Sequence, residues 1–184
     1  INGVILTPGQ EFSFNNIVGE RTAANGFKTA TVYANNKMEQ GLGGGICQVS
    51  STLYNSALYA NLEITERRNH NLTVAYVPLG LDATVVYGTT DFRFKNNRTT
   101  PIKIEAKAEN GLLVVTILGT KSPDDVEVKL KTITNATYNI PVNTIEDPTL
   151  AKGKTIVTQN GSKGYSISTY KIKRIKKWKS RWIN

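Results

Sequence analysis

The sequence predicts an α+β protein: a mainly β N-terminal domain with one conspicuous helix that starts near Cys47, followed by a small all-β module. Three observations favour this fold class: short alternations of apolar and polar residues between turns, one apolar stripe at helical spacing, and a change in charge near residue 121. Residues 1–120 hold 10 Lys and Arg against 9 Asp and Glu, whereas residues 121–184 hold 13 against 5. The predicted domains are therefore residues 1–121 and residues 126–184.

Strands are predicted where β-branched and aromatic residues alternate with polar ones. In the first domain these segments are residues 7–16, 29–36, 72–78, 83–88, 91–97, 101–109 and 112–119. Asn110-Gly111 separates the last two and predicts a tight hairpin turn. In the second domain the predicted strands are residues 126–133, 138–145, 154–159 and 165–173, and no helix is expected there.

One helix is predicted from about Gln48 to Asn61, because apolar residues recur there every three or four positions. The residues of this stripe are Val49, Leu53, Ala57 and Ala60. Asn61 suits the left-handed conformation that ends many helices.

Cys47 is the only cysteine and lies where this helix begins. The first turn of a helix offers unpaired N–H groups and the positive end of the helix dipole, so it favours a thiolate. Gly43, Gly44 and Gly45 allow the backbone to approach a substrate closely. Their N–H groups, together with that of Gln48, are candidates to stabilise an oxyanion.

A base for this thiol is available in His70, the only histidine. Asp82 and Asp91 are the candidates to orient its ring, and Asp82 is favoured because it comes first, at the start of the strand that follows the histidine strand. Cysteine, histidine and acid then follow the chain order of papain-like and transglutaminase-like thiol enzymes, an analogy of order alone. The alternative is structural: a free cysteine often packs as a small apolar side chain, and the glycines form only a turn.

The same counts argue against other classes of site. One cysteine excludes an internal disulfide framework, and one cysteine with one histidine makes a zinc site improbable, so no metal is expected. The glycine run lacks the lysine of a phosphate-binding loop and does not match a dinucleotide fingerprint. We expect no cofactor. No apolar run is long enough to span a membrane.

Several separate blocks, in the expected order, resemble the VanW family of bacterial envelope proteins, which is named from a vancomycin-resistance cluster. They are GGGICQVSSTLYN at residues 43–55, TPGQEFSFN at residues 7–15, LEITERRNHNLTVAYVPLGLDATVVYG at residues 62–88, and DFRFKNN with the following PI. The resemblance covers about residues 1–120 and implies a location in the cell envelope more firmly than it implies a reaction.

The segment YNIPVNTIEDPTLAKGKTIVTQNGSKGYSISTYKIK, residues 138–173, resembles the five-glycine extracellular (G5) domain. This β module is often appended to cell-wall proteins of Gram-positive bacteria. KRIKKWK departs from the usual glycine-containing turn, so the end of the module is expected to be altered or truncated. The resemblance implies an extracellular, wall-associated protein with a signal peptide or membrane anchor upstream of Ile1 in the full gene product.

The C-terminal residues 170–184 carry seven basic side chains and no acidic one. On a Gram-positive surface, anionic wall polymer is the expected partner of such a segment, rather than nucleic acid. Its binding would weaken with salt, because exposed charges are screened over about 10 Å at 0.1 M salt. Lys171 and Lys173 also fit the exposed face of an ordinary strand.

Two functions are compatible with these features. The first is a thiol hydrolase or transferase that acts on peptide or amide bonds of peptidoglycan, with Cys47 as nucleophile, His70 as base and Asp82 as orienting acid. The second is a non-catalytic module that binds or organises wall polymer. The geometry of Cys47 and His70 distinguishes them.

Overall fold

The computed structural model describes residues 1–34 and 37–175, and these form four small sheets and two helices around one apolar core. The strands of the first part are β1 (Ile5–Leu6), β2 (Glu11–Ser13), β3 (Thr29–Ala34), β4 (Lys37–Leu42), β5 (Glu63–Glu66), β6 (Arg93–Lys95), β7 (Ile102–Glu109) and β8 (Leu112–Gly119). The helices are α1 (Phe14–Val18) and α2 (Ile46–Tyr59), and the last strands are β9 (Val126–Tyr138) and β10 (Gly164–Ile175). The α+β class is confirmed.

Every pairing in the described sheets is antiparallel. The strand orders are β1-β7-β8, β2-β6-β5, β3-β4 and β9-β10. Among the described strands, no sheet combines elements from the two sides of Pro123. This agrees with a domain boundary near residues 121–126, which stays a prediction.

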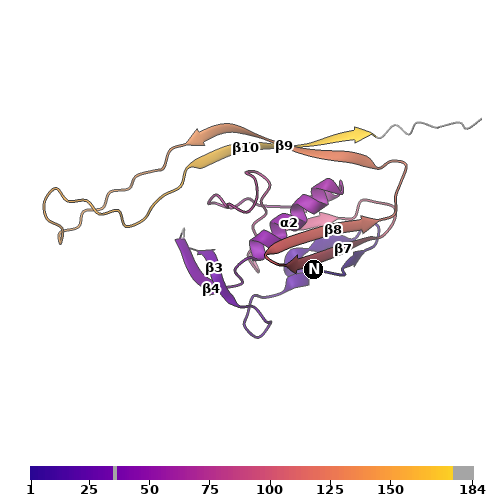
Figure 1. The fold of residues 1–184 in the computed structure, drawn as a ribbon, viewed down its shortest axis with the longest axis horizontal. Coiled ribbons are helices and arrows are strands. Elements are labelled where there is room, and N and C mark those ends of the chain that lie inside the picture. Colours follow the sequence, from indigo (N-terminus) through magenta and orange to yellow (C-terminus); the bar gives the residue numbers. More distant parts are fainter. Residues whose placement is uncertain (35–36, 176–184) are drawn as a thin grey trace, which may run out of the picture.

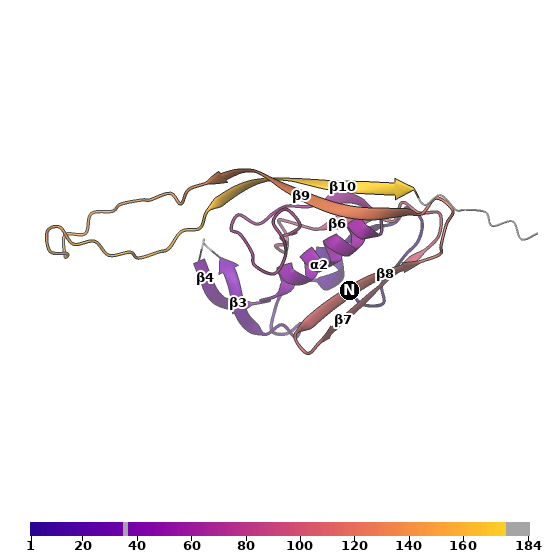
Figure 2. The same ribbon diagram turned by 45° about the horizontal axis from the view of Figure 1, so that its top comes forward.

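Helix α2 lies at the centre of the molecule, with the sheets and the β9–β10 hairpin around it (Figures 1 and 2). Leu53 and Ala57, two members of the predicted stripe, are fully buried. The helix begins at Ile46 and not at Gln48, because the left-handed Gly45 provides the N-cap. Asn61 has a positive φ of 56°, as expected for the residue after a helix end.

The core beside α2 is aromatic. Phe12 of β2 stacks on Phe94 of β6 with ring centroids 4.9 Å apart, and Phe92 lies 5.7 Å from Phe94. Tyr54 of α2 packs edge-on against Phe92 at 5.6 Å. These contacts tie the helix to the β2-β6-β5 sheet.

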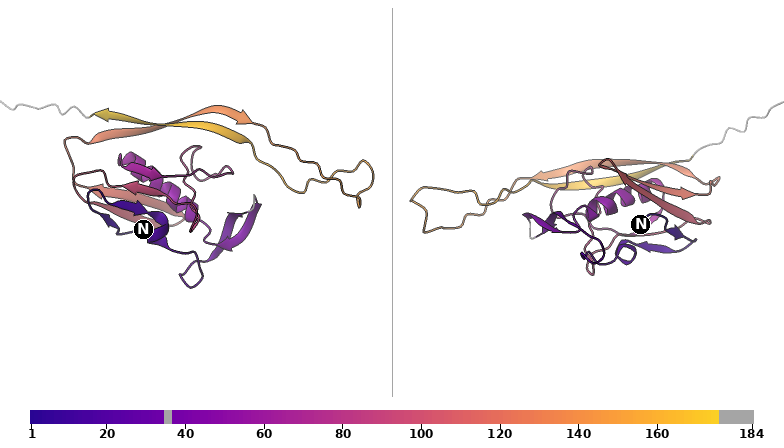
Figure 3. Two further views of the ribbon diagram at one scale, coloured as in Figure 1. Left: turned by 180° about the vertical axis from the view of Figure 1, so that it is seen from behind. Right: turned by 60° about the horizontal axis from the view of Figure 1, so that its bottom comes forward.

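The two-stranded β9–β10 hairpin runs along one side of α2 and continues into a long arm that extends beyond the body (Figure 3). Val128 of β9 is buried, and Leu130 packs against the apolar core. A two-stranded hairpin is only marginally stable by itself. The contact with the core therefore stabilises the β9–β10 hairpin. The predicted Asn110-Gly111 turn between β7 and β8 is also confirmed, with both residues at positive φ.

Several strand predictions were wrong. Residues 72–78 form bends, and residues 83–88 contribute only the isolated bridges at Thr84 and Val86. Residues 139–163 contain no strand, although 138–145 and 154–159 were predicted to be strands. This arm is almost wholly exposed and contains Pro141, which has no N–H to donate to a ladder. Residues 14–16, predicted as strand, begin the short helix α1 instead.

Part of the basic C-terminal segment, residues 176–184, lies outside the described residues. Its predicted salt-sensitive binding to wall polymer therefore stays a prediction. Within the described ranges, neither helix is long and apolar enough to cross a membrane.

Candidate active site

The glycine run connects β4 to α2 and sets the position of Cys47, the second residue of the helix. Gly43 and Gly45 adopt positive φ values of 82° and 87°, which favour glycine. Gly44 is needed for a different reason: a Cβ there would lie 2.4 Å from the Cβ of Ala30 and 2.9 Å from the carbonyl oxygen of Thr31. The run is thus built to bring the helix start against β3.

Replacing Gly44 by Ala is expected to destabilise the protein by about 1–3 kcal/mol, because the added methyl group overpacks this contact. Urea unfolding measures the loss. The double variant Gly44→Ala/Ala30→Gly removes one of the two clashing Cβ atoms, so it should recover part of the stability. A Gly44→Ala protein as stable as the wild type would contradict the close packing.

The first turn of α2 uses most of its free N–H groups internally. Ile46 N–H donates to the Gly43 carbonyl at 3.3 Å, and the N–H groups of Gln48 and Val49 donate to the Gly45 carbonyl at 3.0 and 3.1 Å. The Gln48 N–H is therefore already engaged, unlike in the predicted oxyanion hole. In the described part of the chain, the Cys47 N–H is the one in this turn without a hydrogen-bond partner.

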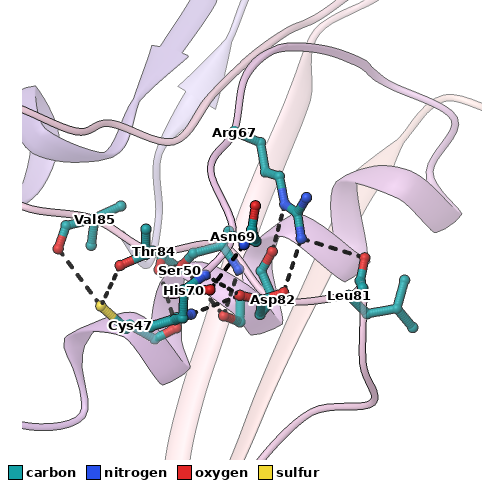
Figure 4. Close-up of polar contacts among 12 residues, drawn as sticks. Cys47, Ser50, Arg67, Asn69, His70, Leu81, Asp82, Thr84 and Val85 are labelled. Atoms are coloured by element: carbon teal, nitrogen blue, oxygen red, sulfur yellow. Dashed lines mark hydrogen bonds and ion pairs between the residues drawn. The ribbon is translucent and has the colours of Figure 1, made fainter. Parts of the chain in front are cut away.

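The sulfur of Cys47 is half-buried and turned toward residues 84 and 85 (Figure 4). It lies 3.7 Å from the Thr84 hydroxyl and donates to the Val85 carbonyl at 3.6 Å. A carbonyl acceptor favours the protonated thiol.

Polar side chains of α2 hold the segment that carries Asp82 and Thr84. Ser50 donates to the Ala83 carbonyl at 2.6 Å, and the Ala83 N–H donates to the Ser51 hydroxyl at 2.9 Å. Asn55 donates to the Leu81 carbonyl at 2.7 Å. Since both serines are buried, these bonds fix residues 81–84 beside Cys47 without a regular sheet.

His70 and Asp82 lie in direct contact. The Nδ1 of His70 lies 2.7 Å from Asp82 Oδ2, and the His70 backbone N–H donates to the same oxygen at 2.6 Å. Two contacts to one carboxylate fix both the loop and the ring. The Nε2 of His70 lies 3.3 Å from the Tyr76 hydroxyl, from the loop that had been predicted as a strand.

Arg67 also binds Asp82, so that Arg67, Asp82 and His70 form a chain of polar contacts, called here the polar chain of the site. Arg67 was not identified from the sequence. Its Nη2 donates to Asp82 Oδ1 at 2.9 Å, and its Nε donates to the Asp82 carbonyl at 2.7 Å. The guanidinium also lies over the ring of Tyr54, 5.4 Å from its centre. The signal available in the sequence was the pair Arg67-Arg68 just before His70, but neither spacing nor pattern assigns a partner to it.

The pKa values of His70, Cys47 and Asp82 depend on one another. Burial lowers the pKa of His70, but the hydrogen bond to Asp82 and the negative charges of Cys47 and Asp82 outweigh it and raise the pKa to about 9. Burial raises the pKa of the Cys47 thiol, yet the positive charge of the neighbouring His70 contributes to a net lowering. Burial likewise raises the pKa of Asp82, and its bonds with His70 and Arg67 bring it below the usual range. The arrangement favours an imidazolium between two anions.

Asp91, the other candidate acid, is held elsewhere. It accepts from the Ser13 hydroxyl at 2.6 Å and from the Asn15 N–H at 2.9 Å, and it pairs with Arg93 at 3.0 Å. Asp91 thus ties β2 and the start of α1 to β6. Of the two acids, Asp82 is the one that contacts His70.

An open cavity of roughly 470 Å³ lies between the segment 67–82 and the β9–β10 hairpin. Arg67, His70 and Asp82 line it from one side, and Tyr165 and Thr169 from the other. Cys47 is not among its lining residues. Among the described residues, no cluster of three His, Cys, Asp or Glu side chains could hold a metal ion.

Comparison with known proteins agrees with this architecture, and the chain belongs to the VanW like protein family, whose model matches residues 1–118. Residues 131–176 match the G5 domain. The chain is 43% identical over 141 residues to "Uncharacterized protein YoaR" of Bacillus subtilis (strain 168), covering 77% of this chain and 46% of that protein.

A second relative is the "Vancomycin B-type resistance protein VanW" of Enterococcus faecalis (strain ATCC 700802 / V583). It is 27% identical over 128 residues, covering 67% of this chain and 46% of that protein. The chain therefore spans about half the length of the curated relatives it matches. No solved structure matches it.

Proposed function

We propose that this protein is a cysteine-dependent enzyme that acts on peptide or amide bonds of the bacterial cell wall. The observation that carries the proposal is the contact of His70 with Asp82 at 2.7 Å, on the segment whose Thr84 lies 3.7 Å from the Cys47 sulfur; the lowered pKa of the thiol agrees with it. Perturbed pKa values in such a cluster are typical of nucleophilic sites. The G5 match and the relationship to a vancomycin resistance protein support the wall as the location.

In the proposed reaction, the thiol leaves the Val85 carbonyl and its proton passes to His70, which gives the thiolate–imidazolium pair that the raised pKa of His70 favours. Because Nδ1 is held by Asp82, Nε2 is the nitrogen that accepts the proton. The thiolate attacks the amide carbonyl, and the free N–H of Cys47 donates to the oxyanion that forms. The imidazolium then protonates the departing amine, leaving a thioester that water or a second amine cleaves.

A non-catalytic role in binding wall polymer is the second candidate. The hydrogen bond from Cys47 to the Val85 carbonyl favours it, since this contact holds the sulfur as a protonated thiol. The G5 domain and the exposed Lys173 of β10 would then carry the contact with the wall.

Alkylation of Cys47 by iodoacetamide at different pH values tests the proposal, and the chain has no second thiol to confuse it. We expect the wild type to react with a midpoint well below the ordinary thiol pKa of about 8.5, and His70→Ala to move the midpoint upward. Asn71→Ala, which changes an exposed neighbour of His70, is the matched control and should leave the profile unchanged.

Purified peptidoglycan provides the second measurement, through the new amino groups that amide cleavage releases. The wild type should release them, and Cys47→Ser should not. If the wild type shows an ordinary thiol midpoint and releases no amine, the enzyme proposal fails and the binding role remains.

A further inference from the structure

The β9–β10 hairpin contacts the site at Gly80. The hydroxyl of Thr169 in β10 donates to the Gly80 carbonyl at 3.0 Å. Gly80 has a φ of +83°, and a Cβ there would lie 2.6 Å from the Thr169 hydroxyl and 2.7 Å from the Cγ2 of Ile167. The hairpin therefore lies directly on the backbone of this residue, with no room for a side chain between them.

The Gly80 carbonyl is also the point where the hairpin meets the polar chain of the site. Arg67 Nη2 approaches the same oxygen at 3.5 Å while it pairs with Asp82 at 2.9 Å. Asp82 in turn holds the ring and the backbone N–H of His70. A continuous set of contacts thus runs from Thr169 through Gly80, Arg67 and Asp82 to His70.

The segment 67–82 needs such support, because it has little regular structure. Residues 71–80 belong to neither a helix nor a strand, and within 67–82 the one β-bridge is at Arg68. The α2 side chains fix residues 81–83, but the part around Gly80 faces the cavity that the hairpin covers from the other side. The hairpin is the element that limits movement of Gly80 on this side.

We propose that the β9–β10 hairpin is part of the reactive site, with Thr169 and Ile167 as positioning residues that act through Gly80 and Arg67 on Asp82 and His70. The inference rests on the proposed function, since it concerns the reactivity of the same Cys47. It makes the G5-type module more than a wall anchor: displacement of the hairpin changes how well the imidazole stabilises the thiolate. Any wall component that moves the hairpin would then alter the reactivity of the cysteine.

The pH profile of iodoacetamide alkylation, measured on the full chain, tests this. Gly80→Ala forces a methyl group against Ile167 and Thr169, and we expect its midpoint to rise by roughly half a pH unit or more, the size expected when a hydrogen-bonded partner of a titrating group is displaced. Gly26→Ala is the matched control, because Gly26 has a φ of +84° with nothing within 4 Å of the added Cβ. It imposes the same backbone strain without a contact to the hairpin and should leave the profile unchanged.

Thr169→Val provides a milder variant that decides the question if Gly80→Ala does not fold. Its control is Lys171→Met, which removes another β10 contact, the 3.4 Å hydrogen bond to the Leu62 carbonyl, without touching Gly80. We expect an upward shift for Thr169→Val alone. Wild-type-like profiles for Gly80→Ala and Thr169→Val would overturn the inference. An ordinary midpoint in the wild type itself would instead overturn the proposed function.

Discussion

Asp82→Asn is expected to lower the pKa of His70 from about 9 toward its ordinary value of 6.5. The amide keeps the shape of the carboxylate but removes the negative charge that lies 2.7 Å from Nδ1. Without that charge the imidazolium is less stable, and the thiolate of Cys47 loses its cationic neighbour. The pKa of the thiol should therefore rise in the same variant.

A proton NMR titration measures this shift directly, because the chain has a single histidine and its ring signals need no assignment. Asp124→Asn is the matched control, since it removes one negative charge from an exposed position outside the site. A His70 pKa that is the same in Asp82→Asn and in the wild type would show that Asp82 does not hold the ring in solution.

The raised pKa of His70 also makes the free energy of unfolding depend on pH. Protonation of His70 stabilises the folded state fully below about pH 6.5, and this stabilisation is lost as the pH rises through about 9. The lowered pKa of Cys47 has the opposite effect on the free energy of unfolding as the pH rises. The effect of His70 should therefore be measured in a Cys47→Ser variant, which has no thiol. There, unfolding by urea should become easier as the pH rises above about 6.5, over a narrower range than in the wild type because Cys47 no longer raises the pKa of His70. Asp82→Asn should reduce the change further.

Phe94→Ala is expected to reduce the free energy of unfolding by about 3–5 kcal/mol, the usual cost of truncating a buried phenylalanine. Phe94 is fully buried, and its ring contacts those of Phe12 and Phe92, so the cavity left behind lies where β2 and β6 meet. Equilibrium urea unfolding gives the difference. Tyr59→Ala is the control, because this aromatic residue of α2 is 56% exposed and should change stability by less than about 0.5 kcal/mol. Equal losses in the two variants would contradict the position of the core.

Features that depend on neighbouring residues could be predicted from the sequence. The helix follows from the spacing of residues such as Leu53 and Ala57, and the β7–β8 turn follows from Asn110-Gly111. The failures have one physical origin: a strand needs a partner. Residues 72–78 have the alternation of a strand, but they form bends on which no ladder is built.

The residues of the site also divide into those that could be predicted from the sequence and those that could not. Cys47 at the start of a helix could be placed from local pattern, and the contact of His70 with Asp82 agrees with the order of the two residues along the chain. Arg67 and Thr169 act through contacts that are 15 and 89 residues apart in sequence, and no short motif encodes them. The catalytic roles of Cys47, His70 and Asp82 stay predictions, to be decided by the alkylation and cleavage experiments.

The contact of β9 with α2 limits where the chain can be cut to make shorter protein fragments. Val128 is buried and Leu130 packs against the apolar core, although both lie beyond the end of the VanW match at residue 118. A fragment that stops at the family boundary would expose the apolar surface that these side chains cover, and such surfaces promote aggregation. Fragments designed for crystallisation, NMR or domain exchange should therefore extend through Ile175, the end of β10. Exchanging the second module for an unrelated domain would remove packing from the first.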